Sequence, residues 1–261
     1  MTDLPPPEVL VLPAAAVGLV MGSFVTALSY RQPRSQSVAH GRSKCPACGH
    51  TLRAADLVPV VSWIVQEGAC RYCKAPISWR YPAIELASMV LFVAAAMTAA
   101  DVVHLALLAA MTVVMTVLAV VDLEQRRLPN VFILALLLLS LSWRWFGDRD
   151  FFAGAVTAVA VFAIGVLLNT GFRAMTGRNG LGMGDAKLLA VASLALPLGP
   201  ALLCLTASGV FGVGWAVVRR LAWWRRPAVE QFPFGPAILA SFWASLAVGP
   251  RTFEDLVSLL A

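Results

Sequence analysis

Long apolar runs recur along the whole chain, and they constrain its fold more than any other feature. Several of them approach the roughly 20 apolar residues that a helix needs to cross a bilayer. Hydrophobic residues make up 59% of the 261 residues and charged residues 13%, whereas a soluble domain carries roughly 25% charged residues. A single signal peptide does not explain runs that recur throughout the chain. The sequence therefore predicts an all-α polytopic membrane protein.

The runs predict about eight transmembrane helices, which would leave both chain termini on the same side of the membrane. Pro197 and Pro200 follow the sixth run, which is short, so this helix is expected to tilt or to merge with the seventh. The expected spans lie near residues 9–29, 82–100, 105–122, 131–146, 151–172, 186–196, 201–218 and 235–249.

The basic residues predict the orientation of these helices. All but three of the 20 Lys and Arg residues lie in segment 31–80 or in loops on the same face. The positive-inside rule places this face in the cytoplasm and both termini outside it. The net charge of +6 is explained by this bias, with anionic lipid as its counterpart, and requires no nucleic-acid partner.

The domain organisation follows from the spans. Residues 1–30 form the first transmembrane helix, residues 31–80 form a small cytoplasmic insert between helices 1 and 2, and residues 81–261 form the remaining membrane domain. Gly18 and Gly22 are small residues on the first helix, and such residues favour close helix packing in lipid.

The insert carries two CxxC pairs, which are typical of a tetrahedral zinc site with four cysteine ligands. Disulfides or a redox CxxC are the alternatives, but a reducing cytosol disfavours structural disulfides, and a thioredoxin-like motif would need a βαβ context. Four thiolates leave no open position for water, so the predicted Zn²⁺ is structural. Its ligands would be Cys45, Cys48, Cys70 and Cys73.

Three acids lie within the predicted spans or at their edges, namely Glu85, Asp122 and Asp185. The topology places all three at the cytoplasmic boundary, where an acid is costly unless it has a partner or a function. Two neighbouring carboxylates share a proton and can activate water for attack on a peptide carbonyl. We therefore expect Asp122 and Asp185 to be catalytic, with the shared proton mainly on Asp122. The alternatives are purely structural roles, in which Asp185 caps a helix and Asp122 pairs with Arg126.

Two glycines flank Asp185 in the motif Gly182-Met-Gly184-Asp185. Because glycine has no Cβ, backbone or substrate can approach closely there. Gly182, Gly184 and Glu85 are therefore candidates for a substrate cleft.

The ordered set of motifs resembles the bacterial type IV prepilin peptidases from about Gly22 to Pro236. Each motif alone is modest, but their order makes the resemblance specific. The motifs are Gly22-Ser-Phe with Arg31 and Pro33, the two CxxC pairs, Pro59 with Ser62-Trp63, Pro76-Ile-Ser with Arg80-Tyr-Pro-x-x-Glu85, Asp122 with Leu128-Pro129, Gly182-x-Gly-Asp-x-Lys187 and Pro233-Phe-Gly-Pro236.

The resemblance implies an aspartic endopeptidase of the bacterial inner membrane that cuts the leader from type IV prepilins or type II secretion pseudopilins at the cytoplasmic face. It places the catalytic pair on Asp122 and Asp185, and the zinc-type ligands on the four cysteines of the insert. Many family members also methylate the new N-terminus with S-adenosylmethionine, and the retained cysteine-bearing insert favours that activity here.

A transporter or channel with boundary acids and a zinc-bearing regulatory loop is the main alternative. Such a protein would place its acids near the middle of the bilayer on broken helices. The acids of this chain are expected at one face instead.

Overall fold

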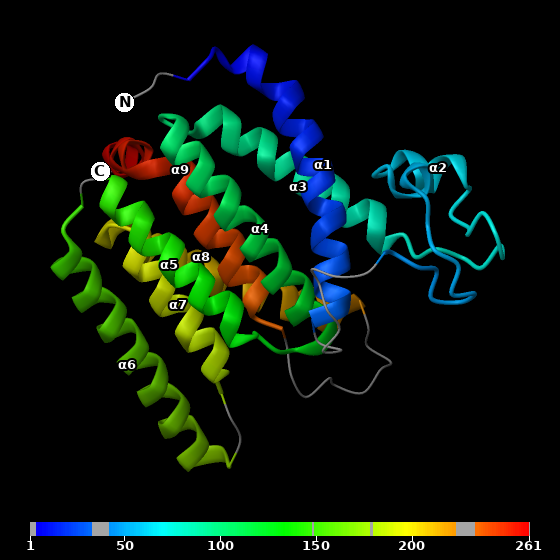
Figure 1. The fold of residues 1–261 in the computed structure, drawn as a ribbon. Helices are drawn as coiled ribbons and strands as arrows, with labels where there is room; N and C mark the ends of the chain where they lie inside the picture. Colours follow the sequence, from blue (N-terminus) through cyan, green and yellow to red (C-terminus); the bar gives the residue numbers. More distant parts are fainter. Residues whose placement is uncertain (1–3, 33–41, 148, 178–179, 223–232, 261) are drawn as a thin grey trace. The chain divides into compact units, whose positions relative to one another are not determined.

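The computed structural model describes residues 4–32, 42–147, 149–177, 180–222 and 233–260. The chain divides into two compact units, Met1–Leu105 and Ala106–Ala261. In Figure 1 the first unit is blue to cyan and the second runs from green to red. Pro33 and Gly41, the ends of the gap after α1, lie outside the described residues, so Pro33 of the first motif is not placed.

The first unit contains two long helices, α1 (Pro7–Arg31) and α3 (Arg80–Thr98), which pack against each other. Glycines of α1 bring their backbones together. A Cβ at Gly18 would lie 2.7 Å from Cα of Met89, and one at Gly22 would lie 2.6 Å from Cα of Glu85. A larger side chain at either position would force the helices apart, which confirms the expected role of these small residues.

The insert between α1 and α3 contains little regular structure. A 3₁₀ helix covers Ala54–Leu57, and the short helix α2 covers Val61–Val65. Two isolated β-bridges, Lys44 to Thr51 and Ala69 to Pro76, close its two cysteine-bearing loops. So small a segment buries little apolar surface, so a bound metal would supply much of its folding free energy.

All regular structure among the described residues of the second unit is helical. Helix α7 lies among the other helices of this unit. Helix α7 contacts α5, α6, α8 and α9, and most of its residues from Ala186 onward are buried. The ribbon shows α7 beside α5 and α8 (Figure 1). The helices are α4 (Val102–Gln125, which begins in the first unit), α5 (Asn130–Phe146), α6 (Phe151–Thr176), α7 (Met183–Ala195), α8 (Leu198–Ala222) and α9 (Gly235–Leu260).

The ends of these helices follow from the sequence. Asp150 accepts hydrogen bonds from the backbone N–H groups of Phe152 and Ala153 and so caps α6, which ends at Gly177 in the left-handed conformation. Pro197 separates α7 from α8, so the sixth and seventh predicted helices do not merge.

The eight predicted helices are all present, but they are not all equally suited to crossing a membrane. Four helices of the described chain are long and apolar enough, namely Glu8–Arg31, Arg80–Thr98, Val102–Gln125 and Phe151–Thr176. Helix α7 has 13 residues, and at 1.5 Å per residue it spans only about 20 Å. The structure therefore supports a membrane protein with four candidate spans among its described residues, and it does not establish eight crossings.

Candidate active site and cysteine centre

The four cysteines of the insert converge. Their Sγ atoms all lie within 4.8 Å of one another, as a shared metal ion requires. Cys45 and Cys70 are buried, whereas Cys48 and Cys73 are exposed. None of the four is in a disulfide. These residues can therefore hold one metal ion, as the spacing predicted.

Each CxxC loop closes through the same local hydrogen bond. The N–H of Gly49 donates to the carbonyl of Cys45 at 2.8 Å, and the N–H of Lys74 donates to that of Cys70 at 2.9 Å. Gly49 and Lys74 both have positive φ, 72° and 59°. In the first loop, the backbone N–H of Cys48 lowers the pKa of the Cys45 thiol to about 7. A thiolate is the form that binds metal.

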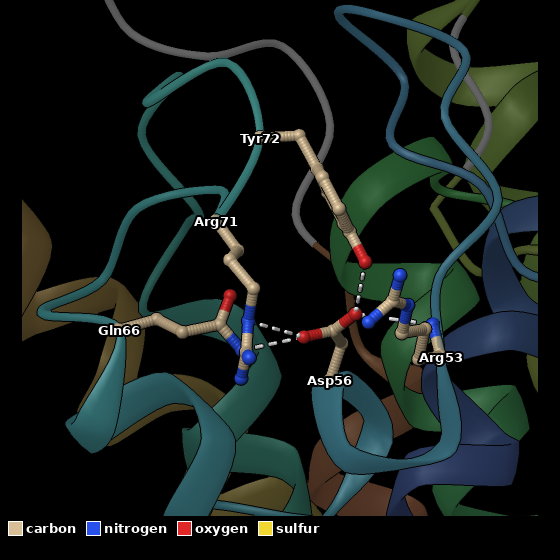
Figure 2. A network of polar contacts seen from close by, with 5 residues as sticks. All are labelled: Arg53, Asp56, Gln66, Arg71 and Tyr72. Atoms are coloured by element: carbon tan, nitrogen blue, oxygen red, sulfur yellow. Dashed lines mark hydrogen bonds and ion pairs between the residues drawn. The ribbon is translucent and has the colours of Figure 1, made fainter.

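Asp56 ties the two halves of the insert together (Figure 2). Its carboxylate accepts a hydrogen bond from the Arg53 backbone at 3.0 Å and one from the Tyr72 hydroxyl at 3.2 Å, and it pairs with Arg71 at 2.9 Å. Gln66 donates its amide N–H, at 3.5 Å, to Oδ1, the same carboxylate oxygen that pairs with Arg71. Burial raises the pKa of Asp56, but the Arg53 N–H, Tyr72 and Arg71 outweigh it and lower the pKa.

Asp56 is linked to the cysteine cluster through two of its partners, which lie between cysteines in the sequence. Arg71 and Tyr72 are the two residues that separate Cys70 from Cys73. On its other face, the Tyr72 ring stacks on His50, with ring centroids 3.6 Å apart. His50 follows the first cysteine loop, so Tyr72 connects both loops.

Glu85 is buried in the first unit, at 6% exposure. Its Oε2 accepts the backbone N–H of Val60 at 2.7 Å, and Ser23 of α1 also hydrogen-bonds to it. Val60 has a φ of 62°, which is costly for a β-branched residue. Glu85 thus holds a strained segment of the insert, and it lies in a different unit from the two aspartates.

A cavity of about 960 Å³ lies in the first unit. Its lining includes Glu85, Ser23 and Thr26 from α3 and α1, and Trp63 and Cys45 from the insert. A volume of this size accommodates a drug-sized ligand. No motif or spacing in the chain indicates this cavity, because it forms between segments that are distant along the chain.

Asp122 and Asp185 are brought together in the second unit. Asp122 lies near the end of α4 at 5% exposure, and Asp185 lies in the first turn of α7. The Leu128 side chain lies against both Gly235, whose N–H donates to Asp122, and Gly184, the residue before Asp185. Two acids that are distant in sequence therefore lie close enough for each to influence the ionisation of the other.

Of the two structural alternatives for these acids, helix capping holds in part and the ion pair does not. Gly182 is the N-cap residue of α7, and its backbone N–H donates to the Asp185 carboxylate in the first turn, so Asp185 helps to cap α7 as well as lying near Asp122. Arg126 is exposed and terminates α4 with a φ of 54°. Both Arg126 and Asp122 are described residues, and no ion pair joins them.

One glycine of the motif lies against Asp185 and the other against the segment that follows α4. A Cβ at Gly182 would lie 2.7 Å from Oδ2 of Asp185. A Cβ at Gly184 would lie 3.2 Å from the Leu128 side chain, between α4 and α5. These glycines allow the α4–α5 loop and the Asp185 carboxylate to approach the start of α7.

Gly235 is the site residue that sequence reasoning missed. Its backbone N–H donates to Oδ2 of Asp122 at 3.0 Å, and a Cβ there would lie 2.7 Å from the same oxygen. Gly235 begins α9, so Asp122 faces a helix N-terminus. The only signal was Pro233-Phe-Gly-Pro236, a rigid turn at a helix start, and that turn does not reveal which acid it contacts.

The fold and the site together define a class of protein: an α-helical membrane protein with an interacting aspartate pair and a tetracysteine insert. Two family models match the chain in order. The Bacterial Peptidase A24 N-terminal domain matches residues 16–99, and the Type IV leader peptidase family matches residues 109–217.

Known relatives agree with these matches. The chain is 35% identical to the prepilin leader peptidase/N-methyltransferase of Aeromonas hydrophila, over 80% of this chain and 72% of that protein. It is 33% identical to the protein of that name in Burkholderia pseudomallei, over 90% and 84%, and 32% identical to the one in Bacillus subtilis, over 85% and 88%. No solved structure matches the chain. The chain belongs to the type IV leader peptidase family.

Proposed function

We propose that the chain is an aspartic endopeptidase that removes the leader from type IV prepilins or type II secretion pseudopilins. The relatives' printed name supports prepilins as the substrate class. The observation that carries the aspartic mechanism is the interaction of Asp122 with Asp185, at the end of α4 and the start of α7.

The chemistry follows from two carboxyl groups that share one proton. The ionised carboxylate takes a proton from water as the water oxygen attacks the scissile carbonyl carbon, and the protonated carboxyl group donates to the carbonyl oxygen. The carboxyl group that took the proton from water then donates it to the leaving nitrogen as the C–N bond breaks, and the other carboxylate takes back a hydroxyl proton as the C=O bond re-forms. No covalent enzyme intermediate is needed.

The helix ends of α4 and α7 favour the shared proton on Asp122, but a third helix end also acts on this aspartate. Asp185 lies at the N-terminus of α7, which favours its charged form, and Asp122 lies at the C-terminus of α4. However, Asp122 also accepts the N–H of Gly235 at the N-terminus of α9. We retain Asp122 as the protonated partner. Infrared carboxyl bands test this, because a protonated band that survives Asp122→Asn but is lost in Asp185→Asn would reverse the assignment.

The positive-inside rule supports the proposed location of cleavage. Arg126 and Arg127 follow Asp122 just beyond the end of α4, and Arg173 lies in the last turn of α6, before the segment that leads to Asp185. We therefore place the pair at the cytoplasmic face of the inner membrane, with both termini on the other side.

A cleavage assay tests the proposal. The full chain in detergent is incubated with a synthetic prepilin peptide, and the products are identified by mass spectrometry. We expect two fragments from the wild type, and a loss of about a thousandfold or more in Asp122→Asn and Asp185→Asn, since each removes a group required for proton transfer. Glu124→Gln is the matched control, because Glu124 is an exposed acid two residues from Asp122. Cleavage that survives in both Asn variants would overturn the aspartic mechanism.

N-methylation of the new N-terminus is a second function, favoured by the cavity of the first unit. S-adenosylmethionine would supply an electrophilic methyl group there. The lining fits such a molecule, since Trp63 and Tyr81 offer aromatic faces and Arg42 and Lys44 offer positive charge for a carboxylate.

The metal proposed for the cysteine centre is a structural Zn²⁺. Cys45 and Cys70 both hold the metal site and line the cavity. We therefore propose that the metal stabilises the part of the cavity wall that these two cysteines form. One zinc per chain by elemental analysis is the expected result, and a metal-free, fully folded protein would contradict it.

A further inference from the structure

We infer that Glu85 binds the α-ammonium group of the newly cut chain and accepts its proton, so that the amine can be methylated. This inference rests on the proposed function, because the acceptor is the product of leader cleavage. It gives a role to a buried carboxylate that cleavage by the aspartate pair does not use.

The first observation is that Glu85 is a buried acid with no cationic partner in the part of the chain that the structure describes. Its partners are the backbone N–H of Val60 and the side chain of Ser23, both uncharged. Among the described residues no Lys or Arg forms an ion pair with it. Burying an unpaired carboxylate is costly, so a cationic ligand is the natural complement.

The second observation is that Glu85 can be reached from a cavity. Although Glu85 is only 6% exposed, it lines the 960 Å³ cavity. The cavity therefore offers a route by which the end of a peptide could reach a carboxylate that is otherwise enclosed. Ser23 and Thr26 beside it supply hydroxyl groups, and the positive charge of the lining comes from Arg31, Arg42 and Lys44, none of which forms an ion pair with Glu85.

The third observation is that the carboxylate is held in place. The backbone of Glu85 lies against Gly22 of α1, where a Cβ would be 2.6 Å from Cα of Glu85. Oε2 is held by the N–H of Val60, whose positive φ of 62° is maintained at a cost. A carboxylate offers about four lone-pair positions, so two neutral hydrogen bonds leave capacity for an ammonium donor.

The chemistry balances. The α-ammonium transfers one proton to the Glu85 carboxylate and becomes a neutral amine. The nitrogen lone pair then forms a bond to the methyl carbon of the sulfonium donor, and the S–CH₃ bond breaks with its electrons going to sulfur. The products are a methylated ammonium, a neutral thioether and a protonated Glu85, which releases its proton to water.

A binding measurement tests the contact without requiring methyl transfer. The probe is a peptide with the mature N-terminus, with either a free or an acetylated amine, added to the full zinc-loaded chain. A charge-assisted hydrogen bond makes binding of the free amine about tenfold tighter. Glu85→Gln should remove this preference, so that both peptides bind like the acetylated one.

This variant separates the inference from a purely structural role. A Gln side chain still presents an oxygen to the Val60 N–H, so a role limited to bracing Val60 predicts that the preference stays. Glu67→Gln is the matched control, because Glu67 is exposed and does not line the cavity, and it should keep the preference for the free amine. A preference that persists in Glu85→Gln would overturn the inference.

The second readout is the ratio of methylated to unmethylated product from a leader-bearing peptide and S-adenosylmethionine. We expect Glu85→Gln to lower this ratio by about tenfold or more. Cleavage and methylation that fall in parallel would contradict the inference. A wild type that fails to cut the leader would instead refute the proposed function, so the two failures are distinguishable.

Discussion

The cysteine centre and the aspartate pair are built in opposite ways. The four cysteines lie between positions 45 and 73, and each loop closes through hydrogen bonds within a few residues. The aspartate site takes its groups from α4, α7 and α9, and the hydrogen bond from Gly235 to Asp122 joins residues 113 positions apart. The first is a local site that one metal ion can organise, whereas the second depends on the packing of a whole helical unit.

The largest expected effect is the loss of the local site. Cys45→Ser removes one of four ligands, so the insert should lose its metal and N-methylation should be abolished. Cleavage of the prepilin peptide should stay within about threefold of the wild type, because the aspartates belong to the other unit. Zinc content and both activities are measured in parallel. Cys204→Ala is the control, since that buried thiol of α8 is outside the cluster, and equal losses in the two variants would break the comparison.

The next largest effect is expected at Gly235. In Gly235→Ala the new Cβ would lie 2.7 Å from Oδ2 of Asp122 and 3.1 Å from its Cγ, so the carboxylate must move. We expect kcat for cleavage to fall about a hundredfold, because small displacements of a catalytic group are costly, while zinc content stays unchanged. Gly171→Ala is the matched control, because its Cβ would meet nothing within 4 Å. Wild-type kcat in Gly235→Ala would show that this contact does not position Asp122.

A smaller effect is expected at Asp56, which holds Arg71 and Tyr72 of the second cysteine loop from outside the ligand set. Asp56→Asn removes the charge that holds Arg71, and we expect metal release to become about tenfold faster, as for other groups that orient ligands. The rate is followed with a chelating dye, with Glu67→Gln as the control. An unchanged rate would mean that the cysteine loops are held by their own hydrogen bonds alone.

The smallest effect is expected within the helical scaffold. Trp243 of α9 donates its indole N–H to the hydroxyl of Thr112 on α4 at 2.7 Å. Trp243→Phe removes this hydrogen bond and should lower the free energy of unfolding by about 1 kcal/mol, with cleavage nearly unchanged. Thermal unfolding in detergent measures the shift. A large loss of cleavage in a folded variant would show that one contact, rather than the whole packing, holds the pair.

The same contrast explains what could be predicted from the sequence. Spacing alone predicted the four cysteines, because a CxxC loop is a local structure, and apolar runs predicted α1 and the helices from α3 to α9. The pairing of Asp122 with Asp185 was predicted from topology and from the family resemblance. Gly235 and the cavity beside Glu85 were not predicted, because both arise where distant segments meet and leave no periodic or spacing signal.

The most direct test of the account supplies the Asp185→Asn protein with two peptides, one carrying its leader and one already cut to the mature N-terminus, together with S-adenosylmethionine. Mass spectrometry then follows cleavage of the first and methylation of the second. We predict that the variant leaves the leader peptide intact and methylates the mature peptide at the wild-type rate. Leader cleavage by this variant at a rate near that of the wild type would contradict the assignment of the aspartate pair.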